Sequence, residues 1–480
     1  MEADFRPFAE RMEAERLPET AIRTFKHYYK QLAQGHTGMI PERDIRPLAS
    51  LPDLEQLPAA LAETGRGALS KAVLLKLNGG LGTGMGLEKA KSLLTVRTLT
   101  EREALTQGEA LTQRKAVTFL DIIARQALHA RVPLVLMNSF ATRDDSLRAL
   151  AKYPKLQGSI PLDFLQHKVP KVLQDGLRPA DWPQDRELEW CPPGHGDIYT
   201  ALVTSGMLDT LLEHGHEVAF VSNADNLGAV LDPLVLGYFV ANELPFLMEV
   251  ADRTAADRKG GHLAQRLSDG RLVLRESAQC PDADMDAFQD IELHRYFNTN
   301  NLWVHLPSLK RLLAEKDGVL GLPMIRNSKT LDPRDPSTPK VYQLETAMGA
   351  AISSFEDAAA LRVPRTRFAP VKTCDDLLGV RSDAYVLTGD WRVVLNPERR
   401  YGVPVISLDS KYYKLIDQME VRFPYGPPSL IECESLTVKG DVRFGRGVVC
   451  RGEVEVVNEG PGQKTVESTL LGGTADYRRA

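Results

Sequence analysis

AVLLKLNGGLGTGMG, residues 72–86, is the most informative stretch of this chain. Its apolar start, 72–77, has the length and composition of a buried strand, and a glycine-rich turn follows directly. Five glycines fall within residues 79–86, more than a turn needs for packing. Glycines at this density let backbone N–H groups converge on an anion and let a base approach the main chain closely. The stretch therefore predicts a phosphate or nucleotide site at the end of a strand.

The turn matches neither of two well-known phosphate-binding fingerprints. No Gly-Lys-Ser/Thr closes it, so it is not a P-loop, and no G-x-G-x-x-G can be placed on it. A dinucleotide-dependent dehydrogenase is therefore a poor interpretation. Lys89 and Lys91 follow the turn, and Lys91 can supply the positive charge that a bound phosphate needs.

Short apolar runs alternate with helical stretches on both sides of this turn. The predicted strands are residues 72–77, 132–137, 217–222 and 245–250, and the predicted helices are residues 119–131 and 232–244. This alternation predicts an α/β fold whose mixed, mostly parallel sheet has helices on both faces. Ligands of such sheets lie beyond the carboxyl ends of the strands, so the polar residues that follow the strands are the candidates for a site.

The two ends of the chain differ from this middle part. Residues 1–65 have helical spacing and predict a helical segment, followed by a catalytic domain over 66–390. Residues 435–457 show short alternating segments broken by glycines, which is typical of a small β-solenoid, with an ordinary β-meander as the alternative. We therefore expect a separate C-terminal domain over 391–480.

Composition excludes several classes of protein. The chain has 480 residues, 43% of them apolar and 26% charged, which excludes collagen-like, low-complexity and mainly disordered chains. The formal net charge of -5 is close to balance, so no nucleic-acid partner is expected. Five widely spaced cysteines without C-x-x-C favour a reducing, cytoplasmic setting. No apolar run approaches the roughly 18 residues of a spanning helix, so no membrane partner is expected.

Four further segments contain side chains suited to chemistry on phosphates and sugars. Residues 192–197, PPGHGD, present His195 between prolines and glycines, whereas most single histidines are structural. Residues 223–226, NADN, place a carboxylate at the end of a strand, where it suits Mg²⁺ or simply caps a turn. Residues 298–301, NTNN, offer amides to sugar hydroxyls or form a turn. Residues 363–373 hold a basic cluster between prolines that suits transition-state charge or lies in a surface loop.

These motifs, taken together, resemble the eukaryotic-type UTP–glucose-1-phosphate uridylyltransferase family, the UDP-glucose pyrophosphorylases. The segments that carry the resemblance are KLNGGLGTGMG, LMNSFAT, PPGHGDIY, NADNLGAVLD, MEV…KGG, FNTNNLW, QLETAMGAAI and VPRTRFAPVKTCDDLL, in this order between about residues 70 and 390. Residues 429–445 resemble the C-terminal β-helix of the family, which implies a short left-handed β-helix within 391–480. The resemblance implies a Rossmann-like nucleotidyltransferase core.

The resemblance also implies a role for individual residues of this chain. The nucleotide-binding residues would be Leu77, Asn78, Gly79, Gly80, Gly82, Thr83, Lys91, Gln166, Gly194 and Asn223, with Gln166 at the uracil. The sugar-phosphate residues would be His195, Asn223, Gly260, Gly261, Asn298 and Asn300. Asp225 would hold the cofactor Mg²⁺, and Lys372 and Lys91 would be the catalytic lysines.

The implied reaction joins UTP and glucose 1-phosphate to give UDP-glucose and pyrophosphate. Two alternatives stay open. One is an enzyme that accepts several sugar 1-phosphates, and the other is a catalytically inactive protein that only binds a nucleotide sugar. The sequence departs from the family at Ala90-Lys91, where the family usually has Pro-Lys, which puts the loop beside the triphosphate in doubt. The C-terminal segment is a candidate for assembly into a homo-oligomer.

Overall fold

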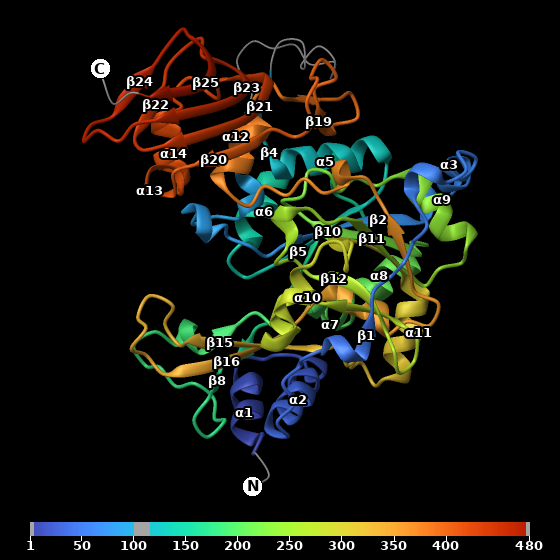
Figure 1. Ribbon diagram of the computed structural model, residues 1–480. Coiled ribbons are helices and arrows are strands. Elements are labelled where there is room, and N and C mark those ends of the chain that lie inside the picture. The colour runs from blue at the N-terminus through green and yellow to red at the C-terminus, as the bar shows by residue number, and fades with distance from the viewer. Residues whose placement is uncertain (1–3, 100–115, 477–480) are drawn as a thin grey trace.

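The computed structural model describes residues 4–99 and 116–476 and is built around one ten-stranded sheet (Figure 1). Four neighbouring strands of this sheet are parallel: β10 (Val218–Asn223), β2 (Ala72–Asn78), β5 (Leu134–Asn138) and β6 (Asp163–Leu165). Six of the seven residues of β2 are buried, as a parallel strand covered on both faces requires. The predicted strand at 72–77 and its neighbours are confirmed.

The other side of the sheet is antiparallel apart from one parallel pair at its edge. Strand β14 (Tyr296–His305) runs opposite to β10, to β11 (Phe246–Asp252) and to β12 (His262–Arg266). The sheet is completed by β1 (Ile45–Arg46), β13 (Leu272–Arg275) and β17 (Ala359–Arg362). The mixed sheet is confirmed, but its antiparallel part is larger than predicted because three strands pair with the reversed β14.

Helices cover both faces of the sheet, and β2 shows how the two faces are divided. Val73 and Leu75 pack in a cluster with α7 (Ile198–Thr204), α8 (Met207–Glu213) and α11 (Leu306–Glu315). Leu74 points the opposite way, into a cluster with α3 (Leu61–Ala68), α5 (Phe119–Ala130) and α9 (Pro233–Ala241). The helices expected at 119–131 and 232–244 are therefore present, and the second ends three residues early.

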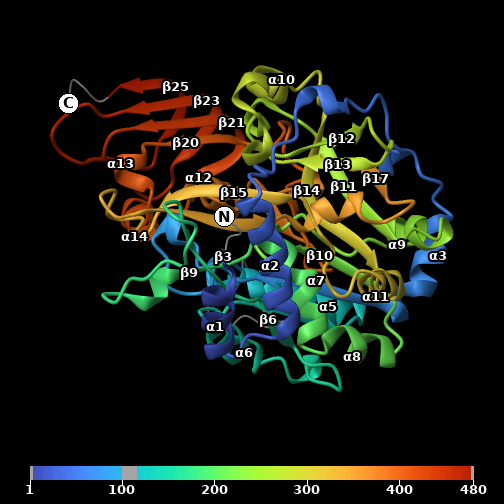
Figure 2. The same cartoon turned by 90° about the horizontal axis from the view of Figure 1, so that it is seen from below.

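Two N-terminal helices lie on a smaller sheet at the opposite end of the molecule from the C-terminus (Figures 1 and 2). The smaller sheet consists of β15 (Met324–Thr330), β16 (Lys340–Thr346) and β8 (Val172–Leu173). Helices α1 (Arg6–Ala14) and α2 (Glu19–Ala33) bury aromatic rings against this sheet and against β7 (Val169–Pro170). Between Gln34 and Ala60 the chain is mostly extended, with short 3-10 turns and β1. The segment 1–65 is thus helical only in part.

The C-terminal strands pair in parallel throughout. Strands β20 (Val405–Leu408), β21 (Ser429–Lys439), β23 (Val449–Val457) and β25 (Leu470–Asp476) form one sheet, and β22 (Val442–Phe444) pairs with β24 (Lys464–Val466). Parallel pairing is compatible with the stacked rungs of a solenoid, whereas a meander is antiparallel. The meander alternative is therefore wrong.

Smaller elements connect these parts. They are α6 (Arg143–Leu150), α10 (Met285–Gln289), α12 (Cys374–Arg381), α13 (Ser410–Tyr413), α14 (Ile416–Arg422), β3 (Thr95–Thr98), β4 (Ala116–Thr118), β9 (Trp190–Cys191), β18 (Tyr385–Leu387) and β19 (Val393–Leu395). No helix within residues 4–99 and 116–476 is long and apolar enough to cross a membrane.

Candidate active site

A cavity of about 330 Å³ opens at the carboxyl ends of β2, β5 and β10. It is lined by Leu77, Asn78, Gly79, Gly80, Lys91, Ser92, Met137, Gln166, Pro192, Gly194, His195, Asn223, Ala224 and Asp225. Ten of the residues singled out in the sequence therefore meet in one place, although they come from four separate segments. The position agrees with the rule that ligands bind beyond the carboxyl ends of parallel strands.

The glycine-rich turn leaves room for the side chain of Gln166. A Cβ atom on Gly79 would lie 2.6 Å from Gln166 Oε1, so any larger residue would displace that amide. Ser139 Oγ donates a hydrogen bond to the Gly79 carbonyl, and the Lys91 N–H donates to the Gly80 carbonyl. These two bonds hold the turn against Ser139, which follows β5, and against Lys91.

The amide of Asn78 lies inside the fold. Its Nδ2 donates to Asn138 Oδ1 at 2.7 Å and to Ser146 Oγ at 2.8 Å, and the residue is buried. Asn78 thereby joins the ends of β2 and β5 beneath the turn. Gly82 and Thr83 follow in the turn and are not among the residues that line the cavity. Thr83 is exposed, and Gly82 adopts a positive φ of 67°.

His195 faces the cavity as a neutral ring. Its Nδ1 accepts a hydrogen bond from the Met348 N–H at 2.9 Å, which places the ring proton on Nε2. Burial lowers the pKa of His195 to about 4, so the ring is uncharged near pH 7. Gly194 before it has a φ of 79°, and a Cβ atom there would lie 2.4 Å from the Thr346 carbonyl oxygen. The turn fits only with glycine at this position.

Asp225 and Lys91 form an ion pair across the cavity. Lys91 Nζ lies 2.6 Å from Asp225 Oδ2, and the two side chains are 14% and 22% exposed. Within the described residues, no three His, Cys, Asp or Glu side chains are grouped to hold a metal ion. Asp225 alone therefore offers one carboxylate, the kind of incomplete ligand set that Mg²⁺ completes with substrate phosphates and water.

Four of the predicted sugar-phosphate residues, Gly260, Gly261, Asn298 and Asn300, form a second group, whereas His195 and Asn223 line the cavity itself. The Asn298 N–H donates to the Gly261 carbonyl, and Asn298 and Asn300 hydrogen bond through their side chains at 2.9 Å. A Cβ atom on Gly260 would lie 2.3 Å from the Phe297 ring, so only glycine fits there. Asn300 adopts a positive φ of 58°, which turns the strand locally. The structure thus gathers the two glycines and the two amides.

Glu276 belongs to this group and is absent from the sequence-based set. A Cβ atom on Gly261 would lie 2.5 Å from Glu276 Oε2, and burial raises the pKa of the Glu276 carboxyl while the charge of Lys372 opposes that rise. The available signal was a carboxylate directly after the apolar strand 272–275. Lys372 itself is exposed, and its charge faces Glu276.

Backbone hydrogen bonds connect the segment that leads to Lys372 with the loop that bears Asp225 in the cavity. The Val371 N–H donates to the Asp225 carbonyl at 3.1 Å, and the Leu227 N–H donates to the Ala369 carbonyl. Lys372 therefore follows directly on a segment that lies against the Asp225 loop. This pairing places the predicted lysine and the predicted metal ligand on adjacent strands of chain.

The other cations of segment 363–373 have structural partners. Arg367 Nη2 and Glu249 Oε1 form a buried ion pair at 2.6 Å, and Arg365 pairs with Asp257 at 2.8 Å. The basic cluster expected from composition is thus not a single phosphate-binding patch.

A phosphate-suited turn, lysines and a carboxylate at the open edge of an α/β sheet define an enzyme of the nucleotidyltransferase class. Residues 22–451 match the model of the UTP–glucose-1-phosphate uridylyltransferase family, and the chain belongs to that family. The earlier resemblance is therefore confirmed.

Curated relatives and solved structures agree with this family. The UTP–glucose-1-phosphate uridylyltransferase of Solanum tuberosum is 41% identical over 426 residues, which is 87% of this chain and 81% of the relative. A protein named probable UTP–glucose-1-phosphate uridylyltransferase from Schizosaccharomyces pombe is 41% identical over 82% of this chain and 74% of its own length. A mutant UDP-glucose pyrophosphorylase from Leishmania major, solved in complex with UDP-glucose, is 45% identical with a TM-score of 0.88, covering 99% of this chain and 100% of that one.

Proposed function

We propose that this chain transfers the uridylyl group of UTP to α-D-glucose 1-phosphate and releases UDP-glucose and pyrophosphate. The supporting observation is the 330 Å³ cavity, where the glycine-rich turn, Gln166, His195, Lys91 and Asp225 converge. The family and the UDP-glucose complex of the Leishmania major relative support the choice of substrates.

In this proposal the uracil lies between the glycine-rich turn and Gln166. A glutamine amide donates and accepts at once, so it complements the N3–H and an adjacent carbonyl of uracil. Cytosine carries an acceptor at N3 and an amino group beside it, so it would leave this amide mismatched. A buried hydrogen-bonding site of this kind discriminates strongly, because the wrong base leaves polar groups without partners.

The reaction is an in-line displacement at the α-phosphorus of UTP. An oxygen of the sugar phosphate forms the new P–O bond, and the bond to the β-phosphate oxygen breaks as pyrophosphate leaves. The attacking phosphate is already an anion, so no general base is needed and catalysis consists of positioning and charge stabilisation. Lys91 and Lys372 offset the negative charge that grows on the phosphates, and neutral His195 donates from Nε2 to the sugar phosphate.

Mg²⁺ belongs to the proposal as the cofactor. Asp225 is the residue that would hold it, since a single carboxylate at a phosphate site suits this ion. When bound, the ion neutralises phosphate oxygens. Lys91 already pairs with one oxygen of Asp225, so the two positive groups would share one carboxylate.

A cytoplasmic setting and self-assembly complete the proposal. All five cysteines are free thiols, which suits a reducing compartment.

Strand β20 is an edge of the C-terminal parallel sheet, and Val405 on it is 67% exposed, so this edge is the candidate surface for a homo-oligomer. Sedimentation of the full chain tests this, and a monomer at all protein concentrations would contradict it.

A pyrophosphate-release assay tests the function. The purified chain is incubated with Mg²⁺, UTP and, in turn, the 1-phosphates of glucose, galactose, xylose and N-acetylglucosamine. Turnover confined to glucose 1-phosphate is the expected result. Similar rates with several sugars would show a broader UDP-sugar pyrophosphorylase, and binding of UTP without any turnover would show a silent relative.

A further inference from the structure

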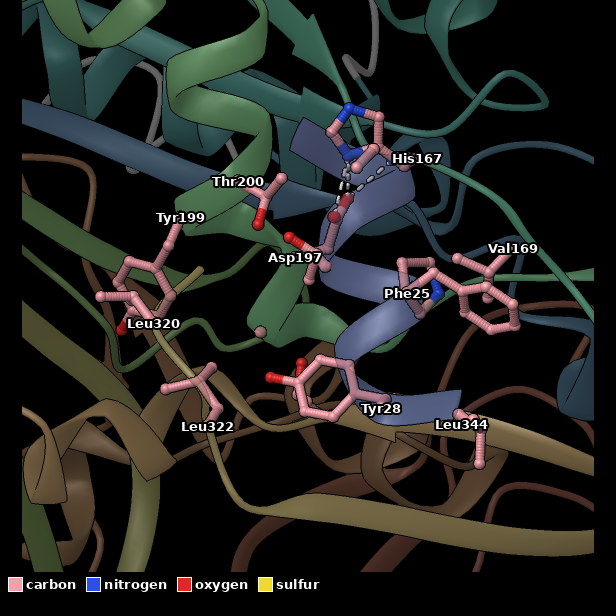
Figure 3. A pocket seen from close by; sticks show the side chains of 15 residues that line it. Phe25, Tyr28, His167, Val169, Asp197, Tyr199, Thr200, Leu320, Leu322 and Leu344 are labelled. Carbon is pink, nitrogen blue, oxygen red and sulfur yellow. Dashed lines mark hydrogen bonds and ion pairs between the residues drawn. The ribbon is translucent and has the colours of Figure 1, made fainter. Parts of the chain in front are cut away.

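A small, partly enclosed cavity, drawn in Figure 3, shares a turn of the chain with the candidate site. Pro193, Gly196 and Asp197 line it, whereas Gly194 and His195 of the same turn line the 330 Å³ cavity. Its volume of about 30 Å³ leaves room for about one water molecule, so it is not a ligand site. Its interest lies in the side chains that surround it.

The same division occurs in the loop after β6. Gln166 faces the 330 Å³ cavity, and the next residue, His167, faces the small one. Figure 3 shows the His167 ring directed toward Asp197 beside α7. Two walls of the candidate site are thus in contact through the side chains on their rear faces.

The Asp197 carboxylate hydrogen bonds to both the backbone N–H and the imidazole ring of His167. Asp197 Oδ2 accepts a hydrogen bond from the His167 backbone N–H at 2.7 Å, and Oδ1 lies 2.8 Å from Nδ1. The two side chains are 8% and 5% exposed. Because a carboxylate only accepts, the ring proton lies on Nδ1. The other ring nitrogen, Nε2, lies 3.0 Å from Thr204 Oγ1, within hydrogen-bond distance.

We propose that His167 and Asp197 are positioning residues for recognition of the uracil. Their buried pair fixes the loop that bears Gln166 against the turn that bears Gly194 and His195. The distance between these two walls of the cavity, and hence the space for the base, is thereby kept constant. The inference rests on the proposed function, because it takes the cavity to be the uridine site. Neither side chain touches the substrate, and each acts through its neighbour in the chain.

The physical reason is the cost of a buried carboxylate that loses a donor. Removing the imidazole leaves Asp197 buried with its backbone donor and without its ring donor, which favours movement of the loop toward water. A shift of about 1 Å in a group that orients a substrate can reduce the rate by about a hundredfold. Selectivity for uracil over cytosine should decrease first, because Gln166 is the residue directly before His167 in the chain.

Steady-state kinetics with UTP and CTP at saturating glucose 1-phosphate test this role. His167→Leu should raise the KM for UTP and lower the UTP-to-CTP ratio of kcat/KM by about tenfold or more. His167→Asn keeps a donor near the position of Nδ1 and should restore most of the ratio. Thr204→Val removes only the outer hydrogen bond and should lower the ratio less than His167→Leu.

His305→Leu is the matched control. His305 Nδ1 bonds Ser308 Oγ at 2.8 Å, and the residue lies opposite Val218, at the other end of β10 from Asn223. This variant should lose stability without any change in the UTP-to-CTP ratio. An unchanged ratio in a folded His167→Leu variant would overturn the inference and leave the proposed function intact. If that variant does not fold, an unchanged ratio in Thr204→Val would overturn the inference instead.

Failure of the proposed function gives a different pattern. The unaltered chain would then show no turnover with UTP and any sugar 1-phosphate. Calorimetric titration of the same variants with UTP and CTP would still decide the positioning role. A preference for UTP that falls in His167→Leu and returns in His167→Asn supports it, and the absence of any preference in the unaltered chain overturns it.

Discussion

Lys372 differs from Arg365 and Arg367 of the same segment in the surroundings of its positive charge. Arg365 and Arg367 each have a carboxylate partner within 3 Å, whereas Lys372 is exposed beside Glu276. An exposed lysine next to the Asp225 loop can reach phosphate oxygens without breaking a buried pair. This difference makes Lys372 the cation of its segment that is suited to catalysis.

Lys372→Ala should lower kcat far more than it changes the KM for glucose 1-phosphate. The reason is that its charge matters most when negative charge grows in the transition state. We expect a loss of about a hundredfold or more, measured by pyrophosphate release under saturating substrates. Arg365→Ala is the control, since Arg365 pairs with Asp257, and an equal loss in both variants would count against a catalytic role of Lys372.

His195 gives a prediction for stability at low pH. The unfolded chain takes up a proton near pH 6.5, whereas burial keeps the folded His195 neutral down to its pKa of about 4. The folded state therefore loses stability as the pH falls from 6.5 toward 4. In urea unfolding, the unaltered chain should lose about 1–2 kcal/mol more than His195→Asn between pH 7.5 and pH 5. Equal losses would contradict the neutral, buried ring.

The loop between the glycine-rich turn and β3 resolves the departure at Ala90. Ala90 has φ -50° and ψ 126° and is 1% exposed, a backbone conformation that proline also adopts. Its N–H has no acceptor among the described residues. The loop therefore has a backbone conformation at Ala90 that a proline would also accept.

Ala90→Pro should stabilise the chain by about 0.4–1 kcal/mol and leave kcat unchanged, because it restricts only the unfolded state. Ala127→Pro in the interior of α5 is the control and should destabilise by about 3 kcal/mol or more. Urea unfolding measures both. A marked loss of stability in Ala90→Pro would show that the loop has another conformation.

The elements that sequence predicts well are those with local signals. The helix at 232–244 was recognisable from Asp232, and the structure shows this side chain accepting from the Leu234 N–H at 2.8 Å. The reversed direction of β14 has no local signal, because strand direction depends on pairing between distant segments. Glu276 did carry a local signal, its position directly after the strand at 272–275, but its proximity to Gly261 and Lys372 arises only on folding.

At the scale of the molecule, the C-terminal strands and the site share one hydrophobic cluster. Met85 of the glycine-rich turn and Val371 beside Lys372 belong to the same buried cluster as Phe444 and Leu436 of the C-terminal sheets. The cluster crosses the boundary expected at residue 390. The C-terminal strands therefore pack against the segments that carry Met85 and Val371 of the site region.

Phe444→Ala should destabilise the whole chain by about 3–5 kcal/mol, the usual cost of emptying a buried aromatic position. Phe444 is fully buried and stacks on Phe423 with ring centroids 4.8 Å apart. UTP binding and far-UV circular dichroism should be lost in one transition. Val403→Ala, at a side chain that is 60% exposed, is the control with an effect of about 0.5 kcal/mol or less. Two separate transitions would contradict a shared core.

The proposed reaction breaks the bond between the α- and β-phosphates of UTP. The direct measurement follows UTP labelled at the α- or the γ-phosphate through one turnover with glucose 1-phosphate and Mg²⁺. The α-label should appear in UDP-glucose and the γ-label in pyrophosphate. Recovery of the γ-label as orthophosphate, or its transfer to the sugar, would contradict the proposed reaction.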